Sequence, residues 1–261
     1  MTREGIIPNS LRLAAAGMAL VLAPAYAAAD GIPGVVMTDS RYLTDWSGVY
    51  IGGKLGGAFS SLSWQQDLNA FTNGATIDPH TPVEFSPNGV AGGVIGGANL
   101  QLGQWIFGGE VSFSGTNLSQ SVQSPFFPAT DRFSTNLDWL LTVEGRIGYS
   151  WDRVMVFGKG GWAGSNATLK VTSTHPAHAG TASFSEFVDG WTIGGGVEYA
   201  AWNSVIIGLE YDYVSLSLNS GGSCPLCDAG LVIDSSPAVV TGTATISAVM
   251  LRASYLFAPE D

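Results

Sequence analysis

The stretch from Trp139 to Gly164, WLLTVEGRIGYSWDRVMVFGKGGWAG, decides the fold because its side chains alternate in character along two arms. The apolar or aromatic set of the first arm is Trp139, Leu141, Val143, Ile147 and Tyr149. The polar or charged set is Asp138, Thr142, Glu144 and Arg146. Successive side chains of a strand point to opposite faces, and only residues 150–153 separate the arms. The stretch therefore predicts an antiparallel β-hairpin.

The same alternation recurs along the chain and predicts six more strands, at residues 47–59, 90–102, 105–114, 190–200, 204–214 and 244–257. Tight turns centred near residues 103, 152 and 202 alternate with polar loops of roughly 20 residues or more. Outer-membrane barrels have such short periplasmic turns and long outer loops. The connections therefore favour a barrel of this kind.

Tryptophan positions indicate which face of the strands is inside. Seven of the eight tryptophans lie at predicted strand ends or in tight turns. They form two predicted aromatic belts, with Trp46, Trp105, Trp151 and Trp202 at the turn end and Trp139, Trp162 and Trp191 at the loop end. Two belts about one strand apart match the two interfaces of a membrane. The apolar face is therefore expected to contact lipid, and the charged face to line the lumen.

Composition agrees with this interpretation. Charged residues make up only 12% of the chain, glycine occurs 35 times, and the mean hydropathy is +0.24. Eight strands are an even number and enough to close. We therefore predict an all-β, eight-stranded antiparallel up-and-down transmembrane β-barrel, in preference to a periplasmic sandwich or a lipocalin-like barrel.

The N-terminal region has the pattern of an exported protein. Residues 1–29 carry two arginines and then a short apolar run with small residues at its end, which predicts a signal peptide cleaved after Ala27 or Ala29. Residues 30–45 show no periodicity and are expected to form an irregular periplasmic segment, and residues 46–261 the barrel. The formal net charge of −11 argues against nucleic acid as a partner.

The lumen is predicted to hold a charge network of Lys54, Glu110, Glu144, Arg146, Lys159, Glu198, Glu210, Asp212 and Arg252, with Asp138 on the same face. An eight-stranded barrel has an interior that side chains can just fill, so these groups are expected to pair. The alternative is a narrow gated ion pathway, which would prefer cations because carboxylates outnumber bases.

Enzymatic and metal chemistry find little support. The histidines His80, His175 and His178 all fall in predicted loops, so no base is placed beside a nucleophile in the wall. A metal or haem site at these histidines is the weaker alternative to solvated loop residues. We expect no enzyme activity, no metal and no cofactor. The pair Cys224 and Cys227 is a candidate disulfide in the oxidising envelope.

Several segments resemble a known family, most specifically Trp46–Gly53, Thr142–Gly148, Gly194–Tyr199 and the following Glu210–Tyr211. They resemble the small outer-membrane β-barrel proteins of alphaproteobacteria, which are related to the OmpA-like transmembrane domain and often called porins. The resemblance implies an abundant surface protein that supports envelope integrity. It also implies that some relatives act as antigens, adhesins or haem binders.

The function expected from the residues and the resemblance is a structural outer-membrane barrel that contributes to envelope integrity and presents surface loops. A small-solute or cation porin is one alternative, and a loop-based adhesin or haem receptor is another. The expected partners are outer-membrane lipid and lipopolysaccharide, the assembly machinery, and an extracellular ligand at the loops.

Overall fold

The computed structural model describes residues 44–67, 83–124, 129–174, 180–219 and 239–257. Its strands are β1 (Gly48–Asp67), β2 (Val83–Phe85), β3 (Asn88–Leu102), β4 (Trp105–Gln123), β5 (Asp131–Trp151), β6 (Val154–Ser173), β7 (Gly180–Ala200), β8 (Val205–Asn219) and β9 (Val239–Phe257). The predicted signal peptide, most of the predicted segment 30–45, both cysteines and all three histidines lie outside the described residues. None of the described residues forms a helix long and apolar enough to cross a bilayer.

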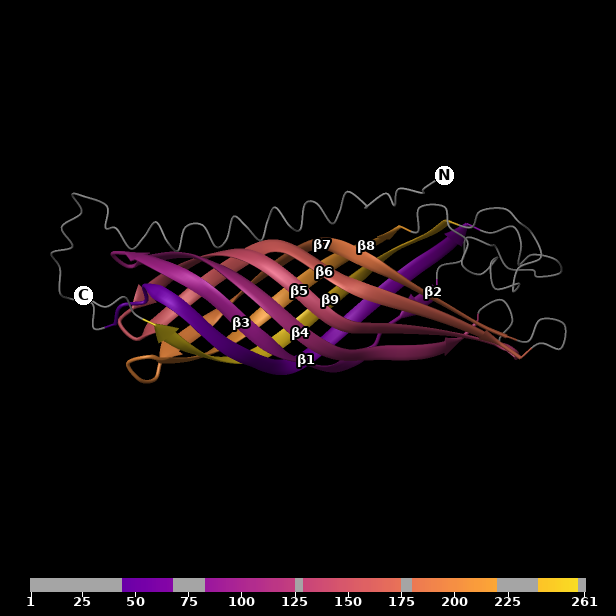
Figure 1. Cartoon of the computed structure of the whole chain (residues 1–261), viewed down its shortest axis with the longest axis horizontal. Helices are drawn as coiled ribbons and strands as arrows, with labels where there is room; N and C mark the ends of the chain where they lie inside the picture. The colour runs from indigo at the N-terminus through magenta and orange to yellow at the C-terminus, as the bar shows by residue number, and fades with distance from the viewer. Residues whose placement is uncertain (1–43, 68–82, 125–128, 175–179, 220–238, 258–261) are drawn as a thin grey trace, which may run out of the picture.

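The strands close into an antiparallel barrel. Each long strand pairs with its neighbour in the chain, and β1 also pairs with β9 from Val49 opposite Phe257 to Asp67 opposite Val239. The short β2 pairs with the C-terminal part of β1, at Leu62 to Trp64. Only Ser86 and Pro87 separate β2 from β3, which pairs with the rest of β1 along the same side. Figure 1 shows the long strands winding around the barrel, with β1 beside β9. The predicted eight-stranded barrel is confirmed.

Tight turns join β3 to β4, β5 to β6 and β7 to β8 at one end, here called the turn end. Gly103 (φ 67°) and Asp152 (φ 55°) lie in two of these turns in the left-handed region. At the opposite end, here called the loop end, the strands run farther than the sequence predicted. β5 begins at Asp131 and β6 ends at Ser173, so the loops are shorter than expected.

The sequence analysis underestimated the length of the strands because the polar and apolar faces exchange places along each strand. In the half near the turns, apolar side chains face outward and polar ones face inward. On β8, for example, Tyr211 is 48% exposed whereas Glu210 is 1% exposed. Nearer the loop end, small polar residues face outward and apolar residues such as Leu216 (1% exposed) face inward. The pattern therefore inverts within a continuous strand and looks in the sequence like a strand end.

The outer surface of the half near the turns is a continuous apolar band. Its large hydrophobic side chains are between 37% and 69% exposed, and they come from every long strand. A soluble protein rarely exposes so extensive an apolar surface. This band is the surface that lipid is expected to cover.

Candidate functional site

The lumen is crossed at mid-height by a layer of ionisable side chains, here called the charged layer. Its members are Lys54, Glu110, Glu144, Arg146, Lys159, Glu198, Glu210, Asp212 and Arg252. They come from β1 and from β4 to β9, because strand alternation turns one side chain in two inward. Every member is at most 8% exposed. The structure therefore brings together all nine residues of the expected lumen network.

Arg252 is the cation that joins three carboxylates from three strands. Its Nη2 atom donates a hydrogen bond of 2.6 Å to Glu110, and its Nη1 atom donates one of 2.6 Å to Glu210. Its Nε atom lies 2.8 Å from a carboxylate oxygen of Glu198. Hydrogen bonds between charged groups are shorter and stronger than neutral ones, and the planar guanidinium can serve several acceptors at once.

Lys159 is the second centre of the charged layer. Its Nζ atom lies 3.0 Å from Asp212, 3.3 Å from both Glu144 and Glu210, and 3.4 Å from Glu110. Lys54 shares two of these carboxylates, at 3.2 Å from Glu210 and 3.3 Å from Asp212. A buried ion must recover a large desolvation cost, and contacts with several opposite charges provide that compensation.

Arg146 completes the layer with two aromatic partners that the sequence analysis did not assign a role. It donates a hydrogen bond of 3.0 Å to Glu198 and one of 2.9 Å to the hydroxyl of Tyr50. The Tyr50 hydroxyl in turn donates to Glu110 at 2.7 Å. The guanidinium also lies over the ring of Phe157, at 4.3 Å from its centroid. The signal for Tyr50 was its place as an aromatic residue on the inward face of its strand.

Two apolar layers enclose the charged layer. At the turn end the buried cluster is Trp46, Tyr50, Ile95, Ile106, Met155, Phe157, Ala200, Ile206 and Leu256. At the loop end a larger cluster includes Leu62, Phe85, Leu118, Phe133 and Leu216. Between the charged layer and the loop-end cluster lies a cavity of about 30 Å³, lined by Lys54, Thr142 and Asp212 among others. Such a volume holds roughly one or two water molecules.

The charged layer is arranged as a set of mutual ion pairs. All four cations of the layer contact carboxylates, so no member is placed as a free base or nucleophile. Among the described residues, no group of three His, Cys, Asp or Glu side chains is arranged to hold a metal ion. The histidines, expected to be solvated loop residues rather than ligands, lie outside the described residues at His80, His175 and His178. So do Cys224 and Cys227, and their disulfide stays a prediction.

Two predicted positions are wrong. Trp46 was expected in the turn-end belt, but it is 0% exposed inside the barrel, where its Nε1 atom donates to the carbonyl of Asp152 at 3.3 Å. It lies four residues before Tyr50, in phase with the inward face of β1, and is buried like Tyr50. Asp138 was expected in the lumen but faces outward, because the register of β5 shifts between Leu137 and Leu140. This bulge places Asp138 and Trp139 together opposite one residue of β6.

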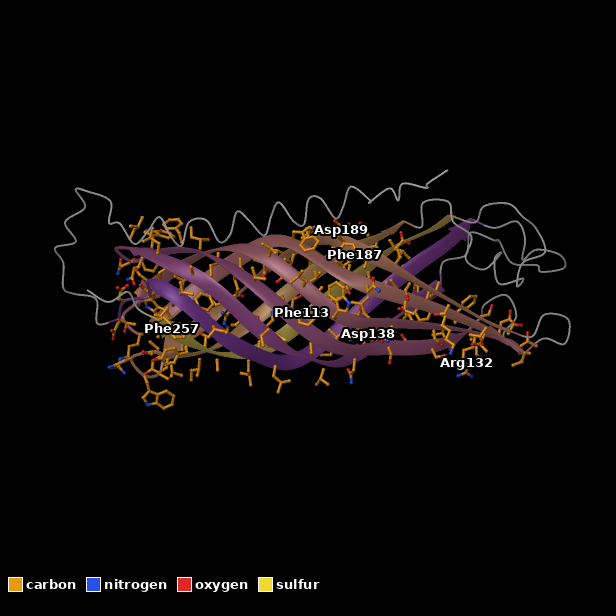
Figure 2. The ribbon with its side chains drawn as sticks, viewed as in Figure 1. Phe113, Arg132, Asp138, Phe187, Asp189 and Phe257 are labelled. Atoms are coloured by element: carbon orange, nitrogen blue, oxygen red, sulfur yellow. The ribbon has the colours of Figure 1, made fainter. Side chains whose placement is uncertain are left out.

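The other belt tryptophans remain on the outer surface. At the turn end, Trp105, Trp151 and Trp202 are 50%, 55% and 69% exposed. Toward the loop end, Trp139 and Trp162 join Phe113 and Phe187 in a row of ring contacts, here called the outer girdle, with centroids 6.0 to 6.3 Å apart. Trp191 is 52% exposed and contacts Tyr213. In Figure 2, Phe257 lies at the turn end, and Phe113 and Phe187 lie near the middle of the barrel's length, between Phe257 and Arg132.

Comparison with known proteins identifies a family and several similar proteins. The sequence profile described as an outer membrane protein beta-barrel domain matches residues 13–228. The 31 kDa outer-membrane immunogenic proteins of Brucella melitensis and Brucella suis are 30% identical over 178 residues, covering 66% of this chain and 71% of theirs. A 22 kDa outer membrane protein of Rhizobium leguminosarum is 26% identical over 171 residues, covering 64% of this chain and 63% of its own. The solved structure of OprG from Pseudomonas aeruginosa matches with 12% identity and a TM-score of 0.46, covering 84% of this chain and 100% of that one.

Proposed function

The chain belongs to the outer membrane protein beta-barrel domain family and is an outer-membrane protein, and from that premise we propose that it is a closed structural barrel. In this role the barrel contributes to envelope integrity and holds its loops at the cell surface. The alternative that the lumen conducts small solutes or cations requires an open path through the charged layer.

One observation carries the proposal: the charged layer is sealed on both sides by apolar clusters. A conducting pore of charged side chains keeps water in contact with them. Here Glu110 is 0% exposed and Glu210 is 1% exposed, and both are occupied by Arg252 and Lys159. Opening a path would separate buried ion pairs and leave charges uncompensated, which typically costs about 3–5 kcal/mol for each pair broken.

The first test is ion conductance of the refolded barrel in a planar lipid bilayer. We expect protein that shows the heat-dependent gel mobility of a folded barrel to insert and stay electrically silent. A known porin in the same bilayer controls for insertion and detection. The variant Leu251→Val, which changes a side chain 68% exposed on the lipid side, is expected to be equally silent.

Conductance of one particular kind would contradict the closed barrel. Discrete openings of the wild type that change in size or cation preference with Glu144→Gln or Arg146→Gln, but not with Leu251→Val, would make the lumen the functional site. Both Glu144 and Arg146 belong to the charged layer, so each would alter a current that passes through it.

Presentation of loops is the second part of the proposal. The Brucella relatives carry the name of immunogenic outer-membrane proteins, which supports exposure of this chain at the cell surface. The alternative of a loop-based adhesin or haem receptor would place its ligand at the loop end. Outer-membrane lipid and the assembly machinery are the partners that the proposed role requires.

A further inference from the structure

Strands β4 to β7 continue beyond the outer girdle as a four-stranded sheet with a polar outer face. Three cross-strand rows form this face: Ser119, Asn136, Thr168 and Ser185; then Ser121, Ser134, Lys170 and Ser183; then Gln123, Arg132, Thr172 and Thr181. Hydroxyl groups bond across the strands, with Thr168 to Ser185 at 2.7 Å and Ser134 to Ser121 at 3.0 Å. The face is therefore an array of hydroxyl groups that can both donate and accept hydrogen bonds, with two amide side chains among them.

Two cations lie on this face, Arg132 on β5 and Lys170 on β6, and both are exposed. Arg132 pairs with Thr172, and Lys170 pairs with Ser134. The two cations are therefore diagonal neighbours, with backbones about 7–8 Å apart. Neither forms an ion pair or a side-chain hydrogen bond with any residue that the structure describes.

Arg132 and Lys170 differ in location from the other described cations. Among the described residues, Lys54, Arg146, Lys159 and Arg252 are buried in the lumen, and Arg153 lies in a tight turn. The exposed cations toward the loop end thus gather on one face of a chain whose formal net charge is −11. Strands β9 and β1 also present hydroxyls near their loop ends, at Thr243, Thr245, Ser61 and Ser63, but no cation.

Because the outer girdle is expected to mark the outer interface of the membrane, this face is expected to stand just beyond that interface. Arg132 lies seven residues beyond Trp139 along β5, which puts it roughly 15–20 Å above the outer girdle for strands tilted as in membrane barrels. In Figure 2, Arg132 lies nearer the loop end than Phe113, Asp138, Phe187 and Asp189. The face points sideways from the barrel axis, so the groups beside it belong to the lipids that surround the protein.

We propose that the face formed by Ser121, Arg132, Ser134, Lys170, Thr172 and Ser183 binds the anionic core sugars of lipopolysaccharide in the surrounding leaflet. The two cations would pair with phosphate or carboxylate groups of the core, and the hydroxyl array would bond to the sugar hydroxyls. The outer girdle below would contact the acyl chains of the same molecules. This inference rests on the proposed outward direction of the loop end and does not depend on a closed lumen.

The test measures binding of the refolded full-length barrel in detergent to purified rough lipopolysaccharide with a complete core. Arg132→Glu and Lys170→Glu are compared with Arg153→Glu, which makes the same change of net charge in the turn on the opposite side of the membrane. We expect each of the first two variants to weaken binding about fivefold, as for loss of an exposed ion pair worth about 1 kcal/mol. Arg153→Glu should bind like the wild type, and gel mobility confirms that each variant is folded.

Further outcomes separate the sources of the anionic group. High salt should remove the difference between the variants and the wild type, because it screens exposed charges. Lipid A without core sugars should bind the wild type and both variants equally. Equal binding of all variants to rough lipopolysaccharide, or an equal loss with Arg153→Glu, would overturn the proposal. So would variants that lose binding to lipid A without core sugars while they bind rough lipopolysaccharide like the wild type.

Discussion

Gly194 shows at the scale of one residue how the charged layer obtains its space. It faces inward on β7, and a Cβ atom there would overlap a carboxylate oxygen of Asp212 and lie 2.7 Å from the carbonyl oxygen of Tyr211. The same atom would lie 3.3 Å from Cε of Lys159. The absence of a side chain at this position therefore lets Asp212 and Lys159 meet. The sequence analysis expected the lumen charges to pair but named no partner for Asp212 or Lys159.

Gly194→Ala is expected to lower the free energy of unfolding by about 1–3 kcal/mol, because the backbone of Tyr211 has to shift. The matched variant is Gly57→Ala on the lipid side, where a Cβ atom meets nothing within 4 Å. There the free energy of unfolding should stay unchanged or rise by up to about 1 kcal/mol. Urea unfolding of the barrel in lipid vesicles measures both. Equal effects of the two substitutions would contradict the packing argument.

Strand pairing at the scale of the elements depends on the tight turns. Asp152 has φ 55° in the turn between β5 and β6, a conformation that costs an L-residue with a side chain roughly 1–2 kcal/mol. Aspartate tolerates it better than most residues, and a β-branched residue tolerates it poorly. Its neighbour Arg153 has no positive φ. The two positions therefore offer a local test of the hairpin geometry.

Asp152→Val is expected to lower the free energy of unfolding by about 1–2 kcal/mol, and Asp152→Gly to keep or raise it. Arg153→Val is the control, because the same side chain enters an ordinary conformation in the same turn. It should change the free energy of unfolding by less than about 0.5 kcal/mol. Unfolding in urea, followed by gel mobility, gives all three values. A loss for Arg153→Val as large as for Asp152→Val would disprove the role of the backbone conformation.

The strands also show why the sequence analysis did not predict their loop-end parts. On β5 the inward residues Phe133 and Leu137 are buried, and the outward residues Arg132 and Asn136 are polar. This is the pattern of a sheet in water, whereas the part from Leu141 to Tyr149 has the pattern of a sheet in lipid. The bulge before Leu140 lies where the two patterns meet. A search for one continuous alternation therefore stops at the membrane boundary.

The whole molecule is a barrel with two surroundings, lipid around the half near the turns and water with lipid headgroups around the other half. Its direction in the membrane can be measured by labelling single cysteines in a Cys224→Ser, Cys227→Ser background. We expect Thr174→Cys, exposed at the loop end, to react with an impermeant maleimide on intact cells. Arg153→Cys in the turn should react only after the outer membrane is permeabilised. The reverse pattern would show that the barrel points the other way.

The sequence by itself determined the strand character, the closed eight-stranded barrel and the inward side of the charged residues. The strands and their inward side follow from a period of two within each strand, which is local, and the barrel from the number of strands and the alternation of short turns and long loops. Only the tertiary structure decided which charges meet, because partners such as Lys54 and Asp212 are 158 residues apart and depend on the stagger of all strands. It also decided that Trp46 packs inside against the turn at Asp152 and that Asp138 faces outside, since a contact between distant residues and a bulge cannot be predicted from the alternation.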